Sequence, residues 1–305
     1  MEFFKDTKIN FQGRRRVALT VSAILVVIGL VSLVIHGGPN YSIDFRGGTA
    51  ITLRFSNPIS ESEVRTALNE INLGDSEVKT ISHASGHPDI LIRVKEANLE
   101  TPAVQLVEGA LTELFPDNPF DVRQVEQVGP KIGEELKGKA VWAIVVALIG
   151  IVIYISWRFE FKFAMGAIVA LIHDVLITLG VFSVLNFEIS LAIVAAFLTI
   201  VGYSLNDTIV VYDRIRENVK KLRASSYFDI INTSINETLS RTVLTSGTTF
   251  VVVLVLYLFG GQVIHNFAFA LLVGVVVGTY SSIFIASPIL LEWQQRTGTK
   301  RKKRR

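Results

Sequence analysis

The chain has 305 residues, 50% of them hydrophobic, and its mean hydropathy is +0.46. This composition excludes an ordinary soluble domain, because the apolar residues gather in blocks long enough to cross the hydrocarbon core of a bilayer. The formal net charge is only +3, and the chain has no cysteine, which excludes a disulfide framework and a thiolate metal site.

Six apolar blocks are near or above the roughly 20 residues that a spanning helix requires. The fold class is therefore a polytopic α-helical membrane protein with six transmembrane helices. The predicted spans are residues 17–35, 139–157, 163–185, 189–212, 238–260 and 265–291. Basic residues precede the first block, as in a signal peptide. Its apolar core exceeds the usual h-region of about 7–15 residues and no small-residue cleavage site follows, so we interpret it as a retained anchor.

A large polar insertion at 36–137 separates the first two spans and is predicted to form one extracytoplasmic α+β domain. Its order of strands and helices is β-α-β-β-α-β, the ferredoxin-like pattern. Ser60 followed by Glu63 is a capping-box signature for the first of its helices. His83 and His87 flank the middle turn, but no further ligand lies nearby in the sequence, so we interpret them as loop histidines rather than a metal site.

The stretch DFRGGT leads into the first strand of this domain and lies in the segment YSIDFRGGTAITLRF, which is predicted to contain an extended stretch that ends in ITLRF. It consists of Asp44, Phe45, Arg46, Gly47, Gly48 and Thr49. The glycines permit a positive φ or a bulge, and Asp44 and Arg46 could pair across the strand. We interpret the stretch as a structural motif, with direct substrate binding as the alternative.

The sequence GEELKGKA, residues 133–140, matches the first part of a phosphate-binding loop. Ala140 stands where a Ser or Thr should hold magnesium, so we reject nucleotide binding. Lys137 and Lys139 are better explained as interfacial residues at the start of the second span.

Lys and Arg residues gather on one side of the predicted spans, which the positive-inside rule assigns to the cytoplasm. The cytoplasmic parts are the N-terminus 1–16, a loop at 213–237 and a basic tail at 292–305. We interpret the loop as a partly helical linker, with a partner contact as the alternative. The tail is interpreted as an orientation signal or a contact with anionic lipid rather than a nucleic-acid site.

The predicted spans contain the ionisable side chains Asp174, Asp207 and Arg241. An Asp at the centre of a spanning helix costs roughly 2.5–3.5 kcal/mol on insertion scales, so such groups usually pair inside a bundle or line a cavity. The fifth span carries a polar stripe that includes Arg241, at helical spacing. We therefore expect Asp207 and Arg241 to approach each other. The stripe consists of Thr238, Arg241, Thr245 and Thr248.

Asp207 has two interpretations. As a proton carrier, it would hold a proton while buried and release it when the guanidinium of Arg241 comes near, because burial disfavours its charge and a cation favours it. As a structural residue, it would only fix helix packing. Asp174 is a second proton-coupling candidate, for which a packing role beside His173 is an equal alternative.

The sixth span has small residues at every fourth position, including Gly274 and Gly278, which predicts close helix packing there. Six spans with one polar cluster are also typical of half of a pseudo-symmetric transporter, whose coupling site lies between two repeats. We therefore expect a partner half.

Three stretches together resemble the SecD/SecF family of protein-export membrane proteins. They are DFRGGT at 44–49, VGPKIGEEL at 128–136 and VGYSLNDTIVVYDRIREN at 201–218, and the similarity extends over nearly the whole chain. The small insertion and the SLNDTIVVYDRI of the fourth span favour the SecF branch over the SecD branch.

The resemblance implies a SecF subunit that pairs with SecD in the cell membrane, with both termini cytoplasmic. It implies work beside the SecYEG channel with SecA, using the proton-motive force to assist preprotein export and release after ATP-driven translocation. YajC and YidC are further candidate partners, besides the exported preprotein and the lipid bilayer; no nucleic acid is implied. The family's proton-conducting acid and arginine match Asp207 and Arg241.

Two other classes stay open. The chain could be a self-assembling exporter of small molecules, or an assembly scaffold in which Asp207 is purely structural. An enzyme is the least favoured class, because no nucleophile with an adjacent base is found. We expect no catalytic residue, cofactor site or metal site.

Overall fold

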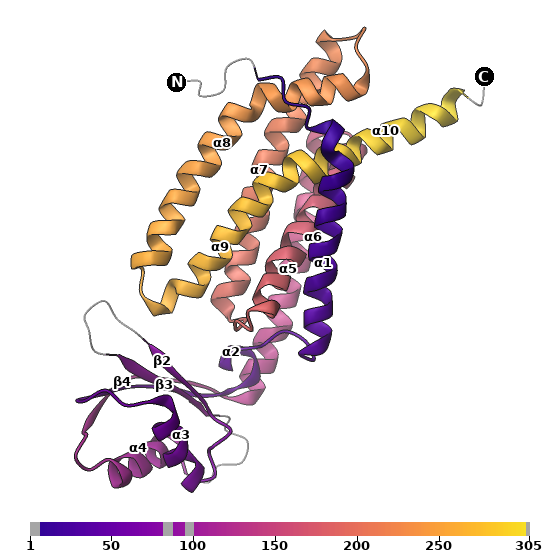
Figure 1. The fold of residues 1–305 in the computed structure, drawn as a ribbon. Helices are drawn as coiled ribbons and strands as arrows, with labels where there is room; N and C mark the ends of the chain where they lie inside the picture. The colour runs from indigo at the N-terminus through magenta and orange to yellow at the C-terminus, as the bar shows by residue number, and fades with distance from the viewer. Residues whose placement is uncertain (1–6, 82–87, 95–100, 303–305) are drawn as a thin grey trace.

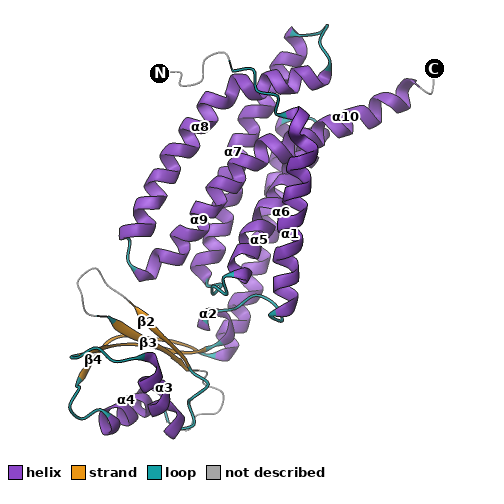
Figure 2. Ribbon diagram, in the orientation of Figure 1, coloured by secondary structure: helices purple, strands orange, loops and turns teal. Residues whose placement is uncertain are grey.

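The structure is a computed structural model, and it describes residues 7–81, 88–94 and 101–302. A column of long helices carries a small sheet domain at one end, while the first and last described residues lie toward the other end (Figure 1). The strands all belong to that end domain (Figure 2). His83 and His87 lie outside the described residues.

Six of the described helices are long and apolar enough to cross a membrane, which confirms the predicted fold class. The sixth is interrupted by a π-helical turn at Ser282–Ala286 and continues beyond it. The spanning helices are α1 Arg15–Ile35, α5 Pro130–Arg158, α6 Phe161–Val184, α7 Leu191–Lys221, α8 Tyr227–Phe259, and α9 Gln262–Ser281 with α10 Ser287–Lys302.

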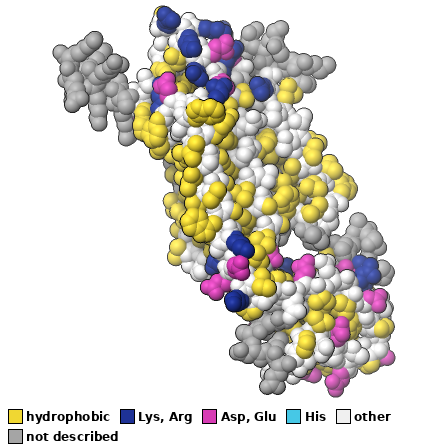
Figure 3. All heavy atoms as spheres, turned by 180° about the vertical axis from the view of Figure 1, so that it is seen from behind, with side chains coloured by type: hydrophobic (Ala, Val, Ile, Leu, Met, Phe, Trp, Pro, Cys, Tyr) yellow, Lys and Arg dark blue, Asp and Glu magenta, His cyan; other side chains and the backbone are white. Residues whose placement is uncertain are grey.

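The surface of the column is an apolar band between two charged ends (Figure 3). Large apolar side chains are exposed there, for example Trp142 and Ile153 on α5 and Val252 on α8. Such exposure would be a liability in water, but it is what a helix needs where its solvent is hydrocarbon. The band therefore marks the part of the column that lies in the bilayer.

The predicted loop at 213–237 is mostly helical, because α7 runs to Lys221 and α8 begins at Tyr227. Charged residues flank the apolar segments of α7 and α8 here. They form ion pairs with each other, and the helices continue through them. Arg214 Nε lies 2.7 Å from Glu237 Oε2, across the pair of helices. Ser226 caps α8 by accepting a hydrogen bond from the amide of Asp229. Hydropathy thus marks where the apolar segment stops, not where the helix stops.

The second spanning helix also begins earlier than predicted, at Pro130, which occupies the first helical turn as proline favours. Residues 133–140, which match the phosphate-loop pattern, are therefore one continuous helical stretch. Lys137 lies with its ammonium 4.4 Å from the ring centroid of Tyr41.

The end domain is a four-stranded antiparallel sheet with strand order β2-β3-β1-β4, as the ferredoxin-like pattern requires. Helices α3 and α4 lie on one face of it (Figure 1). Its core includes Ile51, Leu53, Val64, Leu68 and Ile92, all fully buried. The elements are β1 Gly48–Phe55, α3 Glu61–Glu70, β2 Glu77–Ile81, β3 Asp89–Val94, α4 Ala103–Leu114 and β4 Phe120–Val128.

Helix α3 begins with the predicted capping box. The amide of Glu63 donates to Ser60 Oγ at 3.3 Å, and the amide of Ser60 donates to Glu63 Oε2 at 2.9 Å. Ser60→Ala is expected to lower the stability of the domain by about 1 kcal/mol, the typical cost of a lost cap. Hydrogen exchange of the α3 amides in the full chain measures it. Thr112→Ala, on the exposed side of α4, is the control; equal exchange in both variants would contradict the prediction.

The DFRGGT stretch is extended only at its end, because β1 begins at Gly48. Ile43–Arg46 form the short helix α2, because Ser42 Oγ accepts a hydrogen bond from the amide of Asp44 and starts a turn. Asp44 and Arg46 make no ion pair with each other. Instead, Asp44 Oδ2 accepts from the amide of Leu191 at 2.8 Å, so the stretch ties the sheet domain to α7.

The two glycines of this stretch are needed for their backbone angles and for close packing. Gly47 has φ 76° and Gly48 has φ 134°. A Cβ on Gly47 would lie 2.7 Å from Pro130 Cα, and one on Gly48 would lie 2.5 Å from the carbonyl oxygen of Val94. A side chain at either position would therefore separate the start of the sheet from the start of α5 or from β3.

Candidate functional site

Asp207 lies on α7 inside the bundle, with only 3% of its surface exposed. Ser246 Oγ, on α8, donates to its Oδ2 at 3.2 Å. Its other carboxylate oxygen has no hydrogen-bond partner among the described residues. Among the described residues, the carboxyl group of Asp207 thus has a single hydrogen-bond donor, the hydroxyl of Ser246.

Arg241 and Asp207 are expected to approach each other, and in this structure they form no ion pair. Arg241 is exposed on α8, the helix that packs against α7. Its neighbours in the predicted polar stripe are not directed at Asp207 either. Thr238 and Thr248 donate to carbonyl oxygens of their own helix. The residue of α8 that meets the acid is Ser246, outside the stripe.

A second set of hydroxyl groups continues from Asp207 toward α9. Thr279 Oγ1 donates to Ser246 Oγ at 2.6 Å. One residue beyond Asp207, Thr208 Oγ1 lies 3.1 Å from Ser282 Oγ, at the start of the π-helical turn. Polar side chains of α7, α8 and α9 therefore meet around Asp207, with Thr279 supplied by α9 and Ser282 by the π-helical turn that follows it.

Asp174, on α6, lies in a closed polar cage and is fully buried. Its Oδ1 is 2.9 Å from His173 Nδ1, while its Oδ2 accepts from Ser204 Oγ at 2.5 Å and from Ser281 Oγ at 2.8 Å. Both oxygens are therefore satisfied within the chain. Ser204 lies three residues before Asp207 on the same face of α7, so the α7 residue that binds Asp174 is about one helical turn from Asp207.

The cage of Asp174 extends to the first span. The ring of His173 stacks on that of Tyr280, with centroids 6.1 Å apart. The hydroxyl of Tyr280 donates to the carbonyl of Ala18 at 2.8 Å and lies 3.0 Å from Ser22 Oγ. Asp174 is thus connected through polar contacts to α1, α7 and α9.

The predicted packing glycines lie where α9 crosses α7. A Cβ on Gly274 would lie 2.3 Å from Ile200, and one on Gly278 would lie 2.9 Å from the Cβ of Ser204. This close approach brings the hydroxyls of α9 within reach of the two acids. Larger residues at these positions would move α9 away from the site.

The π-helical turn Ser282–Ala286 lies beside this contact. Tyr212 of α7 donates its hydroxyl to the carbonyl of Ala286 at 3.1 Å, and Ser287 Oγ donates to the carbonyl of Ser282 at 2.9 Å. These bonds satisfy carbonyl groups that the wider turn displaces from the α-helical pattern. Such turns occur frequently at functional sites.

Sequence reasoning missed the hydroxyl residues around the two acids. Ser204 and Ser281 bind Asp174, Ser246 binds Asp207, and Thr279 binds Ser246. A serine in a spanning helix is a weak signal, because it can bond to its own backbone. One signal was available: Ser204 precedes Asp207 by three residues, so both lie on the same face of α7.

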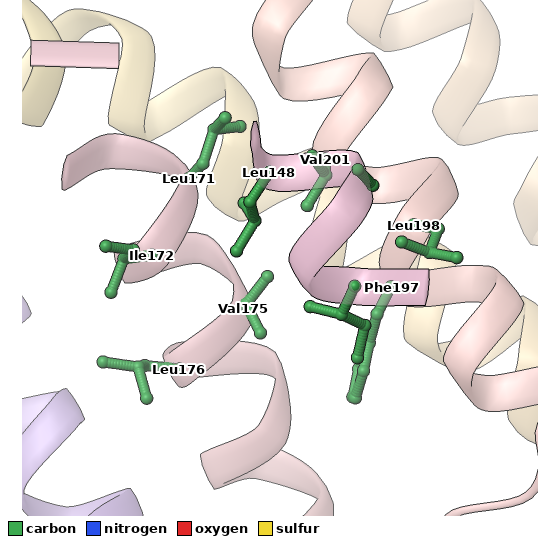
Figure 4. A pocket seen from close by; sticks show the side chains of 10 residues that line it. Leu148, Leu171, Ile172, Val175, Leu176, Phe197, Leu198 and Val201 are labelled. Atoms are coloured by element: carbon green, nitrogen blue, oxygen red, sulfur yellow. The ribbon is translucent and has the colours of Figure 1, made fainter. Parts of the chain in front are cut away.

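A hollow between α5, α6 and α7 is separate from this network (Figure 4). Its lining is wholly apolar and includes Leu148, Val175 and Val201. Because no polar group lines it, the hollow offers no path for a proton. The polar side chains of the site lie on the other faces of α6 and α7, toward α8 and α9.

Comparison with known proteins gives matches over the whole chain. The family described as protein export membrane protein SecD/SecF, C-terminal, matches residues 107–296, and the SecD/SecF GG motif matches residues 32–59. Protein translocase subunit SecF of Desulfurispirillum indicum is 49% identical over 295 residues, covering 94% of this chain and 92% of the relative. The SecF of Rhodothermus marinus is 44% identical over 309 residues, covering 99% and 98%.

Two solved structures agree. The crystal structure of SecDF, a translocon-associated membrane protein from Thermus thermophilus, superimposes with a TM-score of 0.84 at 40% identity, covering 95% of this chain. SecDF in a super-membrane-facing form gives 0.74 at 38% identity, covering 99%. This chain spans 39% and 41% of those two chains, so it corresponds to less than half of each.

Proposed function

Because this chain belongs to the SecD/SecF family of protein export membrane proteins, we propose that its helix bundle couples proton movement to the export of preproteins. It is a multi-pass membrane protein with the role of SecF in the Sec protein translocase. Its relatives are named as translocase subunits, a transport role and not an enzymatic one.

The observation that carries the proposal is the environment of Asp207. A carboxyl group in the apolar layer, with one hydroxyl donor and a free oxygen, can take up a proton without losing a complete set of partners. Arg241, on the exposed side of the neighbouring helix, would change that equilibrium by moving closer. In this proposal Asp207 carries the proton and Arg241 controls its release.

Asp174 is proposed as a second proton-coupling residue; it binds Ser204, which lies one helical turn before Asp207 on α7. Its complete cage of hydrogen bonds also favours the alternative, a structural role, because uptake of a proton would disturb at least one of three donors. Asp174→Asn separates the two. A loss of gradient-driven export equal to that of Asp207→Asn supports coupling, and an unaltered export supports packing.

A Sec translocase partner such as SecD fits the exposed faces of the bundle. In the apolar segment of α5 only 6% of the residues are buried within this chain, and in that of α8 only 11%. In the apolar segments of α6 and α7 the buried share is 50%. Arg241 lies on one of these uncovered helices, so SecD would complete the surroundings of the site. We further propose that the complex works with the SecYEG channel and SecA, and that YajC and YidC are additional partners.

The proposed location is the cell membrane, with both termini in the cytoplasm and the sheet domain outside. Lys and Arg side chains gather at the end of the column opposite the sheet domain, which supports this orientation (Figure 3).

The direct test is preprotein translocation into inverted membrane vesicles that contain SecYEG and SecD, with SecA and ATP, with and without this chain. We expect a proton gradient to stimulate translocation only when the chain is present. Stimulation of the same size in vesicles that lack the chain would contradict the proposal, and improved assembly without any gradient effect would favour the scaffold.

A further inference from the structure

A cluster of charged side chains joins the sheet domain to the loop at 185–190, between α6 and α7. Arg93 of β3 places its Nη1 2.5 Å from Glu188 Oε1 of the loop and 3.2 Å from Glu77 Oε2 of β2. Lys79, also on β2, pairs with Glu77. Glu77 and Glu188 thus share one nitrogen of Arg93, Nη1, which brings their carboxyl groups close to each other.

Glu188 is buried at this contact, with 8% of its surface exposed. The same loop is the place where the domain docks, since the amide of Ile189 donates to the carbonyl of Asn40 at 2.7 Å. The amide of Ser42 donates back to the carbonyl of Ile189 at 3.0 Å. A change in the charge of Glu188 therefore acts directly on the docking surface.

The other charged groups near this contact have partners of their own. Asp44 of α2 accepts from the amide of Leu191, and Lys137 of α5 lies over the ring of Tyr41. Among the described residues, the groups that face Glu188 are thus Arg93, Glu77 and Lys79. Two carboxyl groups that share one guanidinium nitrogen repel each other when both are charged, so one of them is favoured to take up a proton.

We propose that Glu77, Arg93 and Glu188 form a proton-binding latch, in which uptake of one proton outside the membrane strengthens the docking of the sheet domain onto the 185–190 loop. The compartment named rests on the proposed orientation of the chain. The latch itself is independent of Asp207, because it lies outside the membrane-spanning helices.

The electrostatic surroundings of Glu188 favour proton uptake in the docked state. Burial and the neighbouring carboxyl of Glu77 raise the pKa of Glu188 to about 7, against the opposing charge of Arg93. Burial opposes the charge of Glu77 too, but hydrogen bonds from Glu188 and Lys79 and the charges of Lys79 and Arg93 outweigh it and lower its pKa to about 2. Near neutral pH, protonated Glu188 can donate to the Glu77 carboxylate, which Arg93 and Lys79 hold.

The sign follows from linkage. A Glu188 released into water has a pKa near its ordinary value of 4.5, so the docked state binds the proton more tightly. Its contribution to docking is full below that value and is lost as the pH rises through about 7. Between pH 8 and pH 6, one linked proton strengthens the docking equilibrium about ten-fold. Glu77 remains charged throughout this range.

The test is a distance measurement on the full chain in complex with a cysteine-free SecD, in nanodiscs without a proton gradient. The chain has no native cysteine, so Thr112→Cys on α4 and Leu185→Cys beside the loop give one spin-labelled pair. We expect the docked distance to gain population about ten-fold relative to the undocked one from pH 8 to pH 6.

Three variants make the test specific. Glu188→Gln mimics the protonated carboxyl, so it should be docked at pH 8 as the wild type is at pH 6, with no pH response. Glu77→Gln removes the neighbouring charge and should move the midpoint to lower pH by more than about one unit. Glu126→Gln, an exposed acid of β4 in the same domain, should behave as the wild type.

A wild-type distance distribution that does not change between pH 8 and pH 6 would overturn the latch. So would a Glu188→Gln variant that keeps the wild-type response. The pH response should also survive in an Asp207→Asn background, which separates a failure of the latch from a failure of proton coupling in the bundle.

Discussion

Asp207→Asn is expected to abolish the part of preprotein translocation that a proton gradient stimulates, while leaving ATP-driven translocation unchanged. The amide has nearly the same shape and can still accept the hydrogen bond from Ser246, so α7 and α8 should pack as before. It cannot take up and release a proton in the functional pH range. The coupling step is then missing although the bundle is intact. Translocation into inverted vesicles, with and without the gradient, measures the two components separately.

Asp213→Asn is the matched control, because it makes the same change on the same helix. Asp213 pairs with Arg158 at the exposed end of the bundle, where its side chain is 42% exposed. This variant should retain gradient stimulation in full. Co-purification with SecD verifies that both variants assemble. If Asp207→Asn assembled and kept the full stimulation, Asp207 would be a packing residue and the scaffold would be the better explanation.

Gly180→Leu is expected to have the largest effect on stability. Helices α1 and α6 cross with their backbones in contact, because a Cβ on Gly180 would lie 2.8 Å from Gly29 Cα. The atom that it would meet is backbone, which cannot move aside as a flexible side chain could. Overpacking a core typically costs about 1–3 kcal/mol, and separating two helices that use small residues for close approach should cost at least about 3 kcal/mol.

The contact also holds the hydrogen bond of 2.8 Å between Ser32 and Ser183, which a separation of the helices would break. The midpoint temperature of thermal unfolding of the purified chain in detergent should fall sharply. The amount of the chain that accumulates in the membrane should fall as well. Gly150→Leu on α5 is the control, since no atom of another described helix lies within 4 Å of the added Cβ. Equal losses from both substitutions would show that the α1–α6 contact is not what stabilises the bundle.

The architecture was largely accessible from sequence because its signals are strong. Long apolar blocks predict spanning helices, and the alternation and capping of residues 36–137 predict the order of the sheet domain. The ends of the helices were not accessible in the same way. Arg214 and Glu237 look like loop residues in the sequence, yet they form an ion pair between two helices that extend past the membrane.

The site was accessible only in part, for a related reason. Asp174, Asp207 and Arg241 stand out because each is costly in an apolar segment. Which residues surround them depends on how the helices are rotated against each other, and that is set by close contacts such as Gly278 against Ser204. The error at Asp44 has a local cause: a serine two residues earlier caps a helical turn that hydropathy does not reveal.

The join between the sheet domain and the second span is a single residue, because β4 ends at Val128 and α5 begins at Pro130. Gly133 of α5 is packed against the backbone of Phe45, where an added Cβ would lie 3.1 Å from the carbonyl carbon. Because this connection is one residue long and closely packed, the domain cannot rotate independently of α5. Tilting the domain would therefore tilt α5 with it. Since α5 has little packing within its own chain, that movement would be felt mainly by whatever lies against its outer face.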